Sequence, residues 1–318
     1  MNVGVHHRRC AIRHVTTFAA ALVSVSGIAE IWGRPVSVGF QPLTSSEHRL
    51  DSNPGEERGR TQRTGRGDRM VTDYNQGEIA EQYKKTKAIP VRTRIEAYSF
   101  LKHIGAVTGE KVVDIACGAG DYTRVMRRAG AARVVGFDIS EKMIGLAREQ
   151  EAHEPLGIEY FVADASQEVA QQDFDLAISA YLLVYARDRD ELARICRGVA
   201  CRVRPGGRFV TLTTNPGLYT FGRVPDYRKY GFQIKLADAA FEGAPIELTA
   251  FVDGAPLVIE NYYLPIAAYE AALRQAGFHD FVVHVPELAA APQGEDEGDF
   301  WDDYLNYPPA IVIECVRD

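Results

Sequence analysis

The residues best suited to chemistry form a glycine-rich turn at the end of a short apolar run. Residues 112–120 read Val-Val-Asp-Ile-Ala-Cys-Gly-Ala-Gly, so Asp114 is followed by Cys117, Gly118 and Gly120. Glycine permits tight backbone conformations and lets a ligand approach the chain closely. The helix expected next would add free N–H groups and the positive end of its dipole. The turn therefore predicts a binding site for a small molecule.

The residues after the turn narrow the choice of ligand. A phosphate-binding loop needs Gly-Lys-Ser/Thr after its second glycine, whereas Asp121 and Tyr122 follow here. A dinucleotide fingerprint needs a third glycine, and Thr123 occupies that place. The carboxylate of Asp121 would repel a pyrophosphate but suits a ligand that carries positive charge. The turn thus favours a cationic ligand without phosphate.

Further acids follow at the ends of predicted strands. Asp138, 18 residues after Gly120, closes one apolar run and could accept hydrogen bonds from both hydroxyls of a ribose, although NAD enzymes share this feature. Asp164 follows the next run and could hold an adenine amino group, and Asp175 opens the run after that. Together, acids in this order after this turn are a more specific indication of a binding site than any one of them alone.

Alternating strands and helices must position these residues. Apolar runs predict strands at 111–116, 133–138, 158–163, 174–179, 208–213, 280–285 and 310–316. Helical patterns lie at 122–129, 141–150, 188–202 and 266–276. This alternation predicts an α/β fold with a doubly wound, seven-stranded, mostly parallel sheet of the Rossmann-like type.

Three segments stand outside the alternation. Residues 70–109 read as a helical lid, with one helix in 74–99 and a second at about 91–103. Residues 216–263 contain short alternating stretches and aromatic residues, which predicts hairpins inserted after the strand at 208–213. Residues 294–307 form an acidic, aromatic loop before the last strand. The main domain is therefore expected to span 110–318, with both segments as candidate substrate-binding elements.

Residues 1–69 differ from the rest of the chain. They carry ten Arg and no Lys against six acids, with an apolar run only from Val15 to Ile28. Residues 41–69 have the composition of disordered chain. Gly67–Met70 can be encoded by a purine-rich, ribosome-binding-like tract followed by ATG, so Met70 is our expected start. A targeting segment is the alternative interpretation.

Composition limits the partners. The chain has 318 residues, 46% hydrophobic content and a net charge of −7, which combines −11 on residues 70–318 with the positive charge of residues 1–69. An acidic protein of this kind is a poor candidate for binding nucleic acid. Scattered cysteines without CxxC spacing predict neither disulfides nor a metal site, and hence a cytoplasmic protein. We expect no membrane span, and a monomer or a homodimer.

The motif order resembles the class I S-adenosylmethionine (SAM)-dependent methyltransferases over about residues 110–213. Asp114, Gly118 and Gly120 match the family's first motif, and the turn at 204–207 matches the one before its fifth strand. The resemblance implies a methyltransferase that binds SAM and releases S-adenosylhomocysteine (SAH). The cofactor residues that it implies are Tyr83, Asp114, Cys117, Gly118, Gly120, Asp138, Ile139, Asp164, Ala165 and Ser179.

The sequence says less about the methyl acceptor than about the cofactor. Residues 74–75, 79–83 and 114–118 together resemble toxoflavin-synthase-type N-methyltransferases of bacterial secondary metabolism. That resemblance favours N-methylation of a small heteroaromatic molecule, on which Tyr230 and Trp301 would stack. O-methylation of a small phenol or other natural product is the alternative. An NAD-linked oxidoreductase and a non-catalytic SAM-binding protein are more distant ones.

No catalytic base is identified by its spacing. Methyl transfer requires mainly that the nucleophile, the methyl group and the sulfur are aligned and that water is excluded. A base helps most when the nucleophile is a hydroxyl group. The candidates are Tyr181, Tyr185 and His279.

Overall fold

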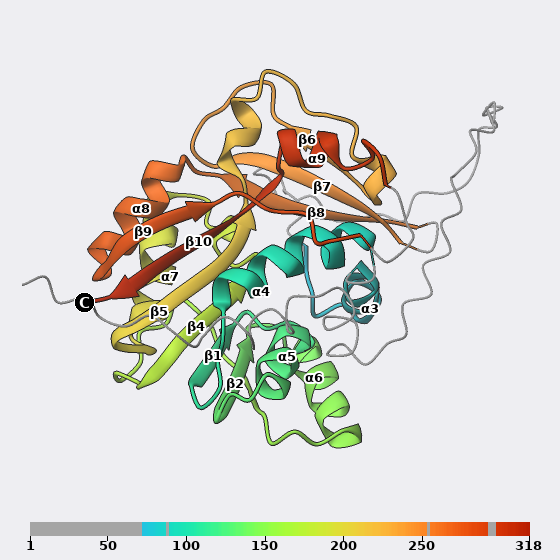
Figure 1. Cartoon of the computed structure of the whole chain (residues 1–318). Helices are drawn as coiled ribbons and strands as arrows, with labels where there is room; N and C mark the ends of the chain where they lie inside the picture. The colour runs from blue at the N-terminus through green and yellow to red at the C-terminus, as the bar shows by residue number, and fades with distance from the viewer. Residues whose placement is uncertain (1–71, 87–88, 253–254, 292–296) are drawn as a thin grey trace, which may run out of the picture.

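The large sheet has seven strands in the order β3-β2-β1-β4-β5-β10-β9 (Figure 1). The computed structural model describes residues 72–86, 89–252, 255–291 and 297–318, so the predicted leader 1–69 lies outside it. The strands are β1 (Lys111–Ile115), β2 (Arg133–Asp138), β3 (Glu159–Val162), β4 (Phe174–Ala180), β5 (Val203–Thr214), β9 (Phe278–His284) and β10 (Ala310–Arg317). β10 runs in the opposite direction to the other six strands, which are parallel to one another. The predicted doubly wound, mostly parallel sheet is confirmed.

Both faces of this sheet are covered, which explains why its central strands are continuous apolar runs. Successive side chains of a strand point to opposite faces. Val112 therefore packs with α4 (Tyr98–Ile104), α5 (Asp121–Arg128) and α6 (Glu141–His153). Val113 packs on the other face with α7 (Arg189–Ala200) and α8 (Ile266–Gln275). Alternate residues of each central strand thus belong to the two hydrophobic cores, one core on each face of the sheet.

Side-chain caps fix where two of these helices begin. The hydroxyl group of Ser140 accepts a hydrogen bond from Met143 N at 3.2 Å, as predicted for the start of α6. Asp188 caps α7 by accepting from Glu191 N at 2.8 Å. These caps hold the turns at the carboxyl ends of β2 and β4, where ligands of doubly wound sheets bind.

The insert after β5 forms a second sheet. Its strands β6 (Phe232–Leu236), β7 (Ala244–Val252) and β8 (Ala255–Tyr263) are antiparallel, in that order. Figure 1 shows this small sheet beyond the ends of β4 and β5, with α9 (Asp302–Asn306) beside it. The predicted hairpins are confirmed, and they cover the carboxyl edge of the large sheet.

The N-terminal segment also lies at this edge. It contains α3 (Gly77–Thr86), the π-helical turn η1 (Arg92–Ala97) and then α4, so its predicted helical character is confirmed. The Ser140 hydroxyl donates to the carbonyl oxygen of Tyr74 at 3.0 Å, which ties the segment to the end of β2. Within the described ranges, no helix is both long and apolar enough to cross a bilayer.

Candidate functional site

The glycine-rich turn after β1 encloses a cleft. Gly118 and Gly120 have φ values of 57° and 86°, which favour glycine. A Cβ atom on Gly120 would lie 2.5 Å from the Tyr160 hydroxyl, whereas one on Gly118 would meet nothing within 4 Å. Gly118 therefore faces open space. The residues around the cleft include Tyr83, Asp114, Cys117, Gly118, Asp121 and Ala180.

Hydrogen bonds fix two of the predicted acids, Asp114 in the lining of the cleft and Asp138 next to it, bonded to Gly118. The Thr123 hydroxyl donates to Asp114 Oδ2 at 2.7 Å, and both residues are buried. Asp138 accepts from Gly118 N and from Ser140 N, each at 2.9 Å. Burial raises the pKa of Asp138, and these backbone N–H groups oppose that shift. Asp138 thus connects the turn after β1 to the end of β2.

The other predicted cofactor residues differ in their exposure and in their position relative to the cleft. Ile139 follows Asp138 and is 67% exposed, so it offers an apolar surface beside the cleft. Asp164 accepts from Ser166 N at 2.8 Å after β3, and the neighbouring Ala165 packs against the core. Ser179 is fully buried and hydrogen-bonds Thr211 Oγ1 at 2.7 Å between β4 and β5. It does not line the cleft, whereas its neighbour Ala180 does.

Asp175 lies at the opposite edge of the sheet from the cleft. It stands near the start of β4, accepts from Lys111 N at 2.8 Å and pairs with Arg204 at 2.6 Å. Lys111 opens β1, so both strands begin here. Grouping Asp175 with the site acids was wrong, because it joins the amino ends of strands.

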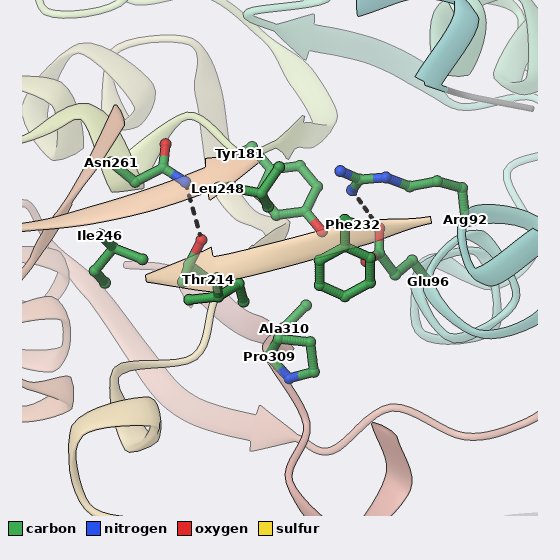
Figure 2. Close-up of a pocket in the computed structure, with 11 residues that line it drawn as sticks. Arg92, Glu96, Tyr181, Thr214, Phe232, Ile246, Leu248, Asn261, Pro309 and Ala310 are labelled. Atoms are coloured by element: carbon green, nitrogen blue, oxygen red, sulfur yellow. Dashed lines mark hydrogen bonds and ion pairs between the residues drawn. The ribbon is translucent and has the colours of Figure 1, made fainter. Parts of the chain in front are cut away.

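A second cavity, the inter-sheet pocket, lies between the large and small sheets (Figure 2). Its polar residues are Arg92, Glu96, Tyr181, Thr214 and Asn261. Its apolar residues include Phe232, Ile246, Leu248 and Pro309. Ala180 lines the cleft and the next residue, Tyr181, lines this pocket. The end of β4 therefore separates two adjacent binding spaces.

Tyr181 holds a strained conformation at this boundary. Its φ of 63° is unusual for a residue with a bulky side chain, and such strain concentrates at functional sites. Burial raises the pKa of Tyr181 well above its ordinary value, although Arg92 opposes the shift. The phenol therefore stays protonated near neutral pH, which makes Tyr181 a poor general base.

A buried ion pair forms the polar wall of the inter-sheet pocket. Arg92 pairs with Glu96, and their side chains are 13% and 5% exposed. The guanidinium carbon of Arg92 lies 4.8 Å from the centroid of the Tyr181 ring. Glu96 also accepts from the Tyr304 hydroxyl at 3.0 Å. The pair was not predicted from the sequence, because Arg and Glu four residues apart are typical of an exposed helix face.

The opposite part of the pocket carries an amide group. Asn261 on β8 is 3% exposed, and its Nδ2 lies 3.5 Å from Thr214 Oγ1 at the end of β5. Its Oδ1 has no hydrogen-bond partner among the described residues. Figure 2 shows the amide with this oxygen turned away from Thr214. A buried amide end without a partner is costly unless a ligand or water satisfies it.

The other two candidate bases, His279 and Tyr185, line neither the cleft nor the inter-sheet pocket. His279 is half-exposed near the start of β9, and its Nδ1 lies 2.8 Å from Asp318 Oδ1. Because β9 runs parallel to β5, His279 stands at the edge of the sheet opposite the cleft. The proposal of His279 as a base was therefore wrong. The Tyr185 hydroxyl lies 2.7 Å from that of Tyr74, and burial raises the pKa of Tyr185.

Tyr230 and Trp301 form part of the core beneath the small sheet. Each is 2% exposed, and their rings stack at 5.2 Å with an interplanar angle of 4°. Neither lines the cleft or the inter-sheet pocket. The prediction of direct stacking on an acceptor was wrong in this structure, because the rings pack on each other. Phe232 from the same cluster reaches the pocket.

One group in the described part of the chain has the composition of a metal site. Ligand atoms of His103, His284 and Glu314 lie within 4.8 Å of one another. The two imidazole rings stack at 3.7 Å with an interplanar angle of 15°. Nearly parallel rings do not direct their in-plane lone pairs to one point. Glu314 also accepts from Arg208 at 2.8 Å, which supplies positive charge.

Comparisons with known proteins relate the chain to methyltransferases. Residues 112–207 match the family described as methyltransferase domain. The N-demethylindolmycin N-methyltransferase of Streptomyces griseus is 27% identical over 236 residues, which cover 70% of this chain and 94% of that relative. A ubiquinone biosynthesis O-methyltransferase of Stutzerimonas stutzeri is 34% identical over 124 residues, 38% of this chain and 51% of that relative. The chain thus matches about half the length of the latter.

A solved structure supports the fold alone. It is a chain from a complex between the Haloferax volcanii Trm112 methyltransferase activator and a methyltransferase. It is 18% identical with a TM-score of 0.50, and the match covers 78% of this chain and 99% of that chain.

Proposed function

Because the chain is a class I SAM-dependent methyltransferase, we propose that it methylates a nitrogen atom of a small, heteroaromatic natural product bound in the inter-sheet pocket. The observation that carries this proposal is the placement of Ala180 and Tyr181. These consecutive residues line the cleft and the pocket respectively, so ligands in the two spaces would meet across one peptide unit. Group transfer between two bound molecules requires such proximity.

The cleft suits SAM in its chemistry. SAM supplies a methyl group on a positively charged sulfur. Asp114 and Asp121 surround the cleft with carboxylates, which favour a cation. We assign the ribose to Asp138, the adenine to Ile139 and Asp164, and the methionine portion to the turn at Gly118. The open space in front of Gly118 leaves room for that approach.

The pocket residues favour nitrogen over oxygen as the acceptor atom. Tyr181 stays protonated, Asn261 is neutral and Glu96 is paired with Arg92, so no group here is well suited to removing a hydroxyl proton. A neutral amine or ring nitrogen needs less help from a base. The name of the Streptomyces relative, an N-methyltransferase, supports the same choice. A phenolic acceptor is the second candidate, supported by the O-methyltransferase relatives.

Two measurements test this function. A thermal-shift series should show stabilisation by SAM and SAH but not by NAD or NADP, because ligands stabilise only the folded state that binds them. Incubation with SAM and either N-demethylindolmycin or a catechol should then be followed by mass spectrometry. Methyl transfer to the nitrogen compound supports the proposal. Stabilisation by NAD alone would contradict the methyltransferase function, and methylation of the catechol alone would contradict the nitrogen acceptor.

A further inference from the structure

The Arg92–Glu96 pair combines a donor and an acceptor at one wall of the inter-sheet pocket. The structure gives the Arg92 side chain one hydrogen bond among the described residues, to Glu96. A guanidinium has five N–H donors. The Arg92 nitrogens are absent from the buried polar atoms that lack partners, and the side chain lines the pocket. Its remaining donors are therefore accessible, on a side chain that lines the pocket.

Glu96 retains capacity to accept. Its carboxylate takes hydrogen bonds from Arg92 and from the Tyr304 hydroxyl at 3.0 Å. An ionised carboxylate offers about four lone-pair sites. Glu96 thus keeps acceptor capacity, and it lines the pocket together with Arg92.

The backbone holds this pair in place. Arg92 and Glu96 lie in η1, and π-helical turns are frequent at functional sites. The ring of Tyr181 supports the Arg92 guanidinium at 4.8 Å. The other walls are mainly apolar, with Phe232, Ile246 and Leu248 from the small sheet. This lining offers apolar walls and one polar edge to a ligand.

We propose that Arg92 and Glu96 select an acceptor whose edge carries an N–H group next to a carbonyl oxygen or imine nitrogen, as in a lactam or cyclic amidine. This inference rests on the proposed function and names the substrate class of the same pocket. Arg92 donates to the carbonyl or imine position, and Glu96 accepts from the N–H group. Asn261 lies across the pocket and presents a further polar contact for a ring substituent.

The test compares two probes of similar shape on the full chain saturated with SAH. Uracil carries the N–H/C=O edge, and 1,3-dimethyluracil lacks every N–H group. Isothermal titration should give the wild-type protein about a tenfold preference for uracil, since a hydrogen bond to a charged group contributes about 1.5–3 kcal/mol. The double variant Arg92→Met/Glu96→Gln should lose that preference. Its glutamine oxygen still accepts from Tyr304, and removing both charges avoids an unpaired buried ion.

Two further variants make the result interpretable. A pair with the same spacing and the same two residue types lies on α8, where Glu270 and Arg274 form an exposed ion pair. The control variant Glu270→Gln/Arg274→Met should keep the preference for uracil. Arg92→Lys keeps the charge but loses the planar fork, so it should reduce the preference even if the double variant fails to fold.

The outcomes separate the two proposals. Equal affinity of the wild-type protein for both probes, an unchanged preference in the Arg92 variants, or no uracil binding up to its solubility limit would overturn the selection by Arg92 and Glu96. Failure of the wild-type protein to bind SAH would instead overturn the proposed function.

Discussion

Thr123 donates its hydroxyl hydrogen to Asp114 Oδ2 across 2.7 Å, behind the cleft formed by the glycine-rich turn. Thr123 occupies the place where a dinucleotide fingerprint has its third glycine. Its hydroxyl instead holds an acid in position at the cleft. The same residue thus argues against a dinucleotide and stabilises the carboxylate that suits a cation.

Thr123→Val should weaken SAM binding while the protein still folds. The substitution keeps the shape but leaves the buried Asp114 carboxylate short of a donor, which costs about 1–3 kcal/mol. Calorimetry should show SAM affinity reduced by about tenfold. Thr123→Ser keeps the hydroxyl and is the matched control. Equal SAM affinity in the valine and serine variants would show that the hydrogen bond does not matter for binding.

Asp138→Ala should reduce SAM affinity by at least about tenfold, because it removes the acceptor to which we assign the ribose hydroxyls. Asp175→Ala is the control, since Asp175 lies at the amino edge with Lys111 and Arg204. That control should lower stability and leave SAM affinity within about threefold, under 1 kcal/mol. The reverse pattern would mean that the ribose site has been assigned incorrectly.

Tyr181→Phe should have a small effect on turnover. The pKa of Tyr181 is raised by burial, so the phenol is not a base whose removal would cost about 10²–10⁴-fold. Steady-state kinetics should show kcat/KM reduced by less than about tenfold, with SAM affinity unchanged. A loss in the range of a general base would contradict this assignment.

Trp301→Ala should destabilise the protein by about 3–5 kcal/mol, because it empties a large site in the core beneath the small sheet. Urea unfolding measures this directly. Trp301→Phe keeps an aromatic ring against Tyr230 and should cost less. A normal unfolding midpoint in the alanine variant would mean that Trp301 is not packed as described.

His103 should make stability depend on pH. Burial, followed by the proximity of His284, lowers the pKa of His103 below its ordinary value of 6.5. The folded state therefore binds fewer protons than the unfolded state, and the free energy of unfolding should fall as the pH drops below about 6.5. Urea unfolding at several pH values should show this decline, and His103→Asn should reduce it. An identical decline in the variant would assign it to other groups.

The large sheet could be predicted well from the sequence because its signals are local. The order of apolar runs, the Ser140 cap and the glycines at 118 and 120 each depend on a few neighbouring residues. Asp175 was placed correctly at the start of its strand, but it was grouped with the site acids because the order of a motif does not show which edge of the sheet carries the site. Trp301 and Tyr230 were misassigned because an aromatic residue looks the same in sequence whether it packs on a ligand or on another ring.

The inter-sheet pocket could not be predicted in the same way. Its walls come from η1, the end of β4, the small sheet and the start of β10, which are far apart in the sequence. Arg92 and Glu96 become a buried pair only when the small sheet covers them. Such a site depends on tertiary packing that no local pattern encodes.

Thr214 and Asn261 stand near the two ends of the insert, and their side chains are 3.5 Å apart. The chain therefore leaves the large sheet and returns to it at nearly the same point. A segment with adjacent ends can be lengthened, shortened or exchanged with little additional loop-closure entropy and no change of strand register. Changes confined to this insert could thus alter which acceptor the enzyme binds. The residues around Asp114 and Asp138 would not need to change.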